Sequence, residues 1–76
     1  MNIYTSGSMK LRLEKREYPY ALFERLNTGD SSTRYWVIGW CTDFNYSDST
    51  VTWANGSYFE NNSVDYALEV LRRKCK

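Results

Sequence analysis

The stretch RYWVIGWCT, residues 34–42, decides the fold of this 76-residue chain. It is rich in aromatic and β-branched residues, which favour β-strands. Successive side chains of a strand point to opposite faces, and here both faces are apolar. Trp36, Ile38 and Trp40 fall on one face, and Tyr35, Val37 and Cys41 fall on the other. Because a strand covered on both sides is usually central, the stretch predicts the middle of a sheet.

The segments before this strand predict its neighbours. In residues 10–17, Leu11 and Leu13 face one way and Lys10, Arg12 and Glu14 the other, which is typical of a half-buried strand. Tyr18-Pro19 ends that run, because proline has no N–H to donate to a ladder. Residues 20–26 fit either a helical stripe or a strand, and we favour a strand because the next segment is an obvious hairpin partner. Residues 27–33 form a polar turn cluster between the two.

The segments after it predict a second hairpin and a helix. Residues 43–49 are a turn cluster, and residues 50–59 are the next strand, with a bulge or bend at Asn55-Gly56. Asn62 or Ser63 caps a helix whose apolar residues recur at helical spacing. The sequence therefore predicts an α+β fold, an antiparallel three- to four-stranded β-meander packed on one C-terminal α-helix. The residues expected to be structural are Trp36, Ile38, Trp40, Trp53, Val64, Leu68 and Leu71.

Length and composition indicate one domain spanning residues 1–76. Residues 1–9 are left open as a flexible lead-in or, from Gly7-Ser8-Met9, a cloning remnant. No basic region followed by an apolar stretch opens the chain, and no apolar run is long enough to span a membrane. The expected compartment is therefore the cytoplasm, where Cys41 and Cys75 would be free, partly buried thiols.

One helix, about 10 Å wide with its side chains, covers only one face of such a sheet. The two-sided central strand therefore requires a second cover. The candidates are a second copy of the chain, a partner protein, stacked bases, or the N-terminal segment with Ile3 and Tyr4.

Charge is unevenly distributed although the chain carries a net charge of only +1. The two ends are basic and the middle is acidic. In a meander, one end of the sheet collects a group that we call the basic tip. Its residues are Lys15, Arg16, Arg72, Arg73 and Lys74.

The residue content argues against catalysis, and we expect no enzyme and no cofactor. The chain has no histidine, so the commonest general base is missing and a Ser-His or Cys-His pair is excluded. Its acidic residues lie mostly in turns and at helix ends. Asp43, Asn45 and Asp48 lack the glycine and terminal glutamate of a calcium loop, so no metal site is expected.

Binding is the function that remains. Tyrosines bring large contact area at small entropic cost, and acidic turns can dock on basic surfaces. The residues expected to bind a protein partner are Tyr20, Tyr35, Asp30, Asp43 and Asp48. The alternative is a small nucleic-acid-binding module that uses the basic tip and an aromatic sheet face, with affinity that falls steeply with salt. The third alternative is a homodimer.

Several short motifs carry a resemblance. They are Val37-Ile38-Gly39-Trp40, Thr52-Trp53, Gly56-Ser57-Tyr58-Phe59 and Ala67-Leu68-Glu69. With them the chain resembles small bacterial and phage domains. Its size and architecture are similar to those of phage-encoded inhibitors of bacterial immunity, such as anti-CRISPR proteins. That resemblance implies a cytoplasmic, non-catalytic inhibitor that occupies a bacterial defence protein or another host protein. The basic ends of this chain depart from a pure DNA mimic.

Overall fold

The computed structural model describes residues 2–29 and 32–75, and within them the chain forms strands followed by one helix. The elements are β1 (Ile3–Ser6), β2 (Met9–Glu17), β3 (Tyr20–Arg25), β4 (Tyr35–Trp40), β5 (Asp43–Asn45), β6 (Thr50–Thr52), β7 (Asn55–Glu60) and α1 (Val64–Lys74). The α+β class and the C-terminal helix agree with the prediction. The sheet has seven strands in these residues, more than the three or four predicted.

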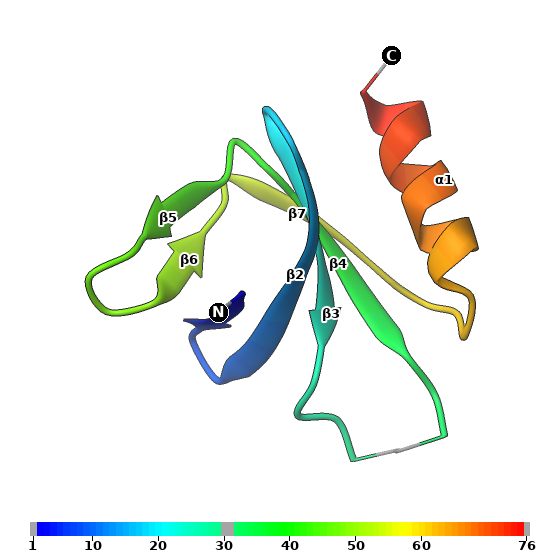
Figure 1. The fold of residues 1–76 in the computed structure, drawn as a ribbon, viewed down its shortest axis with the longest axis horizontal. Helices are drawn as coiled ribbons and strands as arrows, with labels where there is room; N and C mark the ends of the chain where they lie inside the picture. The colour runs from blue at the N-terminus through cyan, green and yellow to red at the C-terminus, as the bar shows by residue number, and fades with distance from the viewer. Residues whose placement is uncertain (1, 30–31, 76) are drawn as a thin grey trace.

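The strands form one curled sheet in the order β5-β6-β1-β2-β3-β4-β7. All neighbours are antiparallel except β1 and β6, which are parallel. The β5–β6 hairpin lies between β4 and β7 in sequence, but in space it lies at the opposite edge of the sheet. There Thr5 N donates to Ser49 O at 2.9 Å. In Figure 1 the hairpin and β1 lie on one side of the central strands, and α1 lies on the other.

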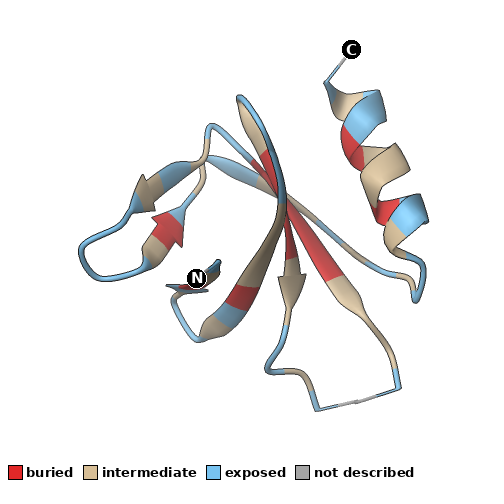
Figure 2. Cartoon of the chain, viewed as in Figure 1, coloured by how far each residue is buried: buried red, intermediate tan, exposed pale blue. Residues whose placement is uncertain are grey.

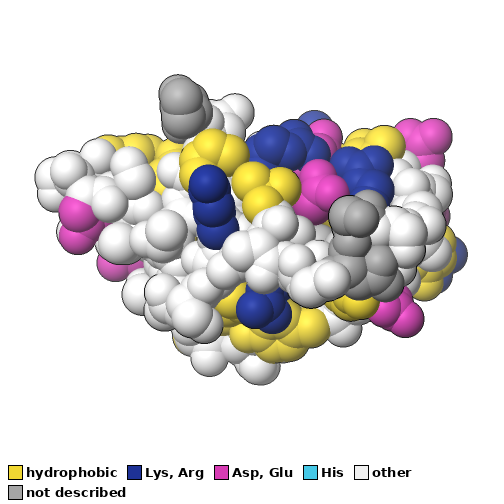
Figure 3. Space-filling model, turned by 90° about the horizontal axis from the view of Figure 1, so that it is seen from below, with side chains coloured by type: hydrophobic (Ala, Val, Ile, Leu, Met, Phe, Trp, Pro, Cys, Tyr) yellow, Lys and Arg dark blue, Asp and Glu magenta, His cyan; other side chains and the backbone are white. Residues whose placement is uncertain are grey.

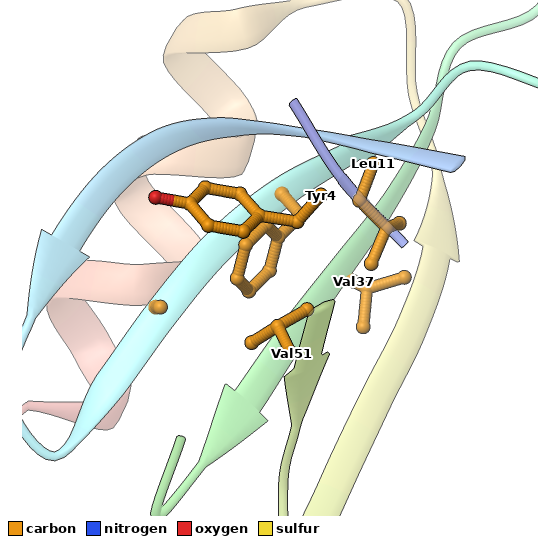
Figure 4. Packing of buried hydrophobic residues seen from close by; sticks show 6 residues of the cluster. Tyr4, Leu11, Val37 and Val51 are labelled. Carbon is orange, nitrogen blue, oxygen red and sulfur yellow. The ribbon is translucent and has the colours of Figure 1, made fainter. Parts of the chain in front are cut away.

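Two apolar cores fill the two faces of the central strands, where the buried segments of Figure 2 gather. The concave core is formed by Tyr4, Leu11, Ala21, Phe23, Val37 and Val51. Figure 4 shows several of these side chains converging from strands far apart in sequence. The helix core is formed by Leu22, Trp36, Ile38, Ala67 and Leu71. The second cover is therefore the N-terminal strand, one of the four candidates, together with a hairpin that the sequence did not suggest as a cover.

Strand β4 is central and two-sided, as predicted. Trp36 and Ile38 face the helix, and Val37 faces the concave core. Trp40 departs from the prediction, because its side chain is 44% exposed. It lies at the last position of β4, beside Tyr20 at the margin of the helix core.

A bulge in β2 changes which of its charged residues face the helix. The register pairs Leu13 with Phe23 but Lys15 with Leu22, so one extra residue, Glu14, is accommodated between them. Beyond the bulge the faces are exchanged. Lys15 joins the helix side with Leu22, and Arg16 joins the concave side with Ala21.

Two other expectations about the strands need correction. Residues 43–49 were expected to be a turn, but Asp43–Asn45 pairs with β6 as a short strand and only residues 46–49 turn. Residues 50–59 were expected to be one strand, but the strand is interrupted, and β6 and β7 are separate strands. The break lies at Trp53 and Ala54, before the predicted Asn55-Gly56 bend. It lets the Trp53 ring pack 5.9 Å from Phe23 in the concave core.

The helix forms as predicted, and residues 20–25 are a strand as favoured. Ser63 is the N-cap and its side chain accepts from Tyr66 N at 3.3 Å. Asp65 lies in the first turn and three basic residues lie in the last, which suits the helix dipole.

Gly39 is the point where Trp53 comes closest to the sheet. A methyl group at Gly39 would lie 3.0 Å from Trp53 Cβ and 3.1 Å from Thr42 Oγ1. We therefore expect Gly39→Ala to lower the free energy of unfolding by about 1–3 kcal/mol, because the backbone and Trp53 must both shift. Urea denaturation measures this. Gly29→Ala is the matched control, since nothing lies within 4 Å of its methyl position, and an equal loss there would contradict the packing argument.

Candidate functional site

A shallow groove on the concave side of β4 and β7 is the main candidate site. Its volume is about 280 Å³. We call it the β7 groove, and it is lined by Arg25, Tyr35, Trp36, Val37, Tyr58, Phe59 and Glu60. The cross-strand register explains the grouping, because Arg25, Tyr35 and Glu60 form one row across three strands. Phe23, Val37 and Tyr58 form the next row.

The β7 groove offers both apolar contact and charge. Tyr58 is 61% exposed, although Trp53 Nε1 donates to its hydroxyl at 3.3 Å. Arg25 donates from Nε to Asn27 Oδ1 over a long 3.5 Å. Among the described residues, neither Arg25 nor Glu60 belongs to an ion pair. A ligand of mixed apolar and charged character fits such a surface better than a purely anionic one.

The structure distributes the five residues expected to bind a partner over separate surfaces. Tyr35 lines the β7 groove, whereas Tyr20 packs against the helix core. Asp43 lies at the open end of the β5–β6 hairpin and Asp48 in its turn. Asp48 accepts from Thr50 N and Oγ1 at 3.2 and 2.6 Å, which is ordinary turn bonding. Asp30 lies outside the described residues.

The basic tip is assembled only in part. Lys15 and Arg72 line a hollow of about 280 Å³ beside Leu68 and Leu71. Arg16 points elsewhere, because the β2 bulge sends it to the concave side. Its guanidinium lies 4.2 Å from the Phe44 ring centroid and donates to Tyr46 Oη at 2.5 Å.

Acidic neighbours offset much of the charge at this tip. Arg72 Nη1 lies 2.6 Å from Glu69 Oε2, and Arg73 Nε lies 3.6 Å from Glu69 Oε1. Lys15 Nζ lies 3.9 Å from Glu17 Oε2. These pairs are exposed, so they contribute little to stability, yet they reduce the positive field.

Tyr20, Trp40 and Lys74 come together beside the tip. They line a hollow of about 310 Å³ with Ile38, Asn55, Gly56 and Ser57. Tyr20 and Trp40 are direct cross-strand partners. The sequence named Tyr20 and Lys74 for different functions and assigned Trp40 to the core, and the structure places all three at one hollow.

A partly buried ion-pair network at the opposite end of the sheet is structural. Glu24, only 14% exposed, accepts from Arg34 Nε at 2.9 Å and from Arg12 Nη2 at 2.8 Å. Hydrogen bonds from Arg34 lower the pKa of Glu24 most, and those from Arg12 add to the shift against the opposing effect of burial. Figure 3 views the molecule from this end, where acidic and basic side chains lie next to one another.

The cysteines are free but more accessible than expected, because both Cys41 and Cys75 are exposed. Desolvation is the larger cause that raises the pKa of Cys75, and the nearby Glu17 charge is the smaller one. The Cys75 thiol is therefore less reactive at neutral pH. Within residues 2–29 and 32–75, His, Cys, Asp and Glu side chains form no group of three that would hold a metal ion.

Comparison with protein families, with curated proteins and with solved structures finds no match for the chain. In the described parts of the chain, no helix has the length and apolarity needed to cross a bilayer.

Proposed function

We propose that this protein acts by binding a protein partner at the β7 groove and blocking the surface that it covers. The observation that carries the proposal is the groove itself, where Tyr35 lies between Arg25 and Glu60 in one row, and Val37 and Tyr58 lie in the next. Tyrosine and arginine are enriched among the residues that dominate protein interfaces. Arg25 and Glu60 have no ion-pair partner within the part of the chain that the structure describes, and charges of both signs suit a protein surface, which also carries both.

The action proposed is occupancy without catalysis. The chain has no histidine, and the groove holds one carboxylate and no second acid to work with it. The resemblance in size and architecture to phage inhibitors of bacterial immunity supplies the class of partner. We propose a bacterial defence protein or another host protein, bound in the host cytoplasm.

The first experiment is an affinity pull-down from bacterial lysate with and without nuclease, repeated with variants. We expect one stoichiometric protein partner that survives nuclease with the wild-type chain. Arg25→Glu and Tyr35→Ala should each reduce its recovery at least tenfold. Tyr46→Ala, at an exposed tyrosine on the β5–β6 hairpin, is the matched control and should retain the partner.

The results with these variants show whether the partner binds at the β7 groove or at the β5–β6 hairpin. Retention of the partner by the folded groove variants, with loss in Asp43→Asn or Asp48→Asn, would move the site to the hairpin. Proteins that vanish after nuclease treatment would overturn protein binding altogether.

A second candidate, single-stranded nucleic-acid binding, is favoured by the hollow that brings Tyr20, Trp40 and Lys74 together. Exposed aromatic rings next to basic groups are the usual platform for stacked bases. The acidic partners of Lys15 and Arg72 weigh against it. A labelled oligonucleotide tests it: affinity should fall steeply with salt and be lost in Trp40→Ala and Lys74→Gln if this candidate holds.

A further inference from the structure

Strand β7 is an edge strand without the usual protection of an edge. It closes the strand order, and no described strand pairs with its outer side; in Figure 4 it is the outermost strand beside β4. Natural edges are blunted by shortness, bulges, proline or lysine. The opposite edge, β5, has three residues and carries Asp43. In contrast, β7 has six residues, a regular register with β4, no lysine, arginine or proline, and a single charged side chain, Glu60, at its last position.

The hydrogen-bonding pattern shows which backbone groups of β7 face outward. Asn61 N donates to Arg34 O at 3.0 Å, continuing the ladder between β7 and β4. Because these bonds alternate along an antiparallel pair, Phe59 and Ser57 also bond toward β4. The N–H and C=O groups of Gly56, Tyr58 and Glu60 therefore point away from the sheet. These three residues are evenly spaced, with Tyr58 at their centre.

We propose that β7 pairs antiparallel with β7 of a second copy of this chain, with the two-fold axis passing at Tyr58. The spacing is self-complementary, since Tyr58 then faces Tyr58 of the second copy and each Gly56 faces a Glu60. Each of these pairs exchanges two backbone hydrogen bonds, about six in all. A two-fold contact of this kind closes on itself and gives a dimer that does not grow further.

The side chains of the paired strands are also complementary. Glu60, which has no ion pair among the described residues, would lie opposite a glycine. At the position of the missing Gly56 side chain, a methyl group would lie 2.7 Å from Trp53 Nε1 and 2.8 Å from Tyr58 Oη. The Trp53 N–H already donates to Tyr58 Oη, which leaves the Tyr58 O–H as the donor that the carboxylate of the other copy meets. No like charges are placed opposite each other.

The helix side of the seam adds apolar contact. Phe59 would lie opposite Ser57 of the second copy, and the Tyr66 ring packs edge-on against Phe59 at 6.1 Å. Tyr66 is 46% exposed in the single chain. Pairing takes up Tyr58 and Glu60, which also line the β7 groove, and leaves Arg25 and Tyr35 of that groove open. The observations that carry the dimer are those of the β7 edge and not those of the partner site. The proposal therefore does not depend on the proposed function.

Sedimentation velocity of the purified full chain across a hundredfold range of concentration tests the dimer. We expect the mass to rise to twice that of the single chain. Tyr58→Lys places two like charges directly opposite each other and should leave a monomer over the same range. Tyr46→Lys is the matched control at a 64% exposed tyrosine and should still dimerise. Circular dichroism confirms that both variants are folded.

A cross-linking measurement tests the dimer independently of Tyr58→Lys, in case that variant fails to fold. In a Cys41→Ser, Cys75→Ser background, Tyr58→Cys should form an interchain disulfide, because directly paired Cα atoms lie about 5.5 Å apart, within disulfide range. Tyr46→Cys should not. A chain that stays monomeric at every concentration overturns the proposal. So does a folded Tyr58→Lys dimer, or equal cross-linking at positions 58 and 46.

Discussion

Replacing Trp36 by alanine is expected to lower the free energy of unfolding by about 3–5 kcal/mol, the largest effect of any single substitution discussed. The Trp36 side chain is 1% exposed and lies in the helix core. Its Nε1 donates to Asn61 O at 2.8 Å, and the Arg34 guanidinium lies 4.8 Å from its ring centroid. Alanine removes all of these contacts and leaves a cavity. Because native domains have only about 5–15 kcal/mol of stability in all, this loss is a large share of the total.

Chemical denaturation at neutral pH measures the effect of Trp36→Ala, and Trp40→Ala is its matched control. Trp40 is the same residue type on the same strand and the same face, but it is 44% exposed. Its replacement should cost less than about 1 kcal/mol. Equal losses at the two positions would show that the helix does not bury β4 as described.

Replacing Glu24 by glutamine is expected to cost about 1–3 kcal/mol at pH 7, because a charged acceptor shared by two arginines is lost. The effect should depend on pH. The arginines hold the pKa of the folded-state carboxyl below its ordinary value of about 4.3. A lowered pKa stabilises the folded chain above the unfolded-state pKa, and this stabilisation disappears as pH falls through the folded-state pKa.

Denaturant melts of wild type and Glu24→Gln between pH 7 and pH 2.5 test this. The two stabilities should differ at pH 7 and converge as the pH falls from the ordinary carboxyl pKa of about 4.3 through the lowered folded-state pKa of Glu24. Glu17→Gln is the matched control, since its exposed contact with Lys15 at 3.9 Å should change stability by less than about 1 kcal/mol. A pH-independent gap for Glu24→Gln would contradict the assigned network.

The sequence predicted those elements whose pattern is local. The two-sided apolar alternation of residues 35–40 identified β4, and the Ser63 cap with its apolar stripe identified α1. What it missed depends on distant pairing. Nothing local indicates that β6 joins β1, because the contact between Thr5 and Thr50 links segments far apart in the chain. The bulge at Glu14, which separates Lys15 from Arg16, was equally invisible to a simple alternation.

The candidate site was predicted only at Tyr35. Arg25, Tyr58 and Glu60 join it through the cross-strand register, and the hairpin inserted between β4 and β7 hides that β7 returns beside β4. The sequence signal for this site was the consecutive pair Tyr58-Phe59, because it places an aromatic side chain on each face of β7.

Strand β3 is covered by an apolar core on each face. Ala21 and Phe23 belong to the concave core and Leu22 to the helix core, and all three are 0% exposed. Fraying of α1 or release of the β5–β6 hairpin uncovers only one side of this strand. Its amide hydrogens should therefore exchange with deuterated solvent only when the whole chain unfolds. The exchange rate of these amides would therefore report global unfolding, and faster exchange elsewhere in the chain would report partial opening.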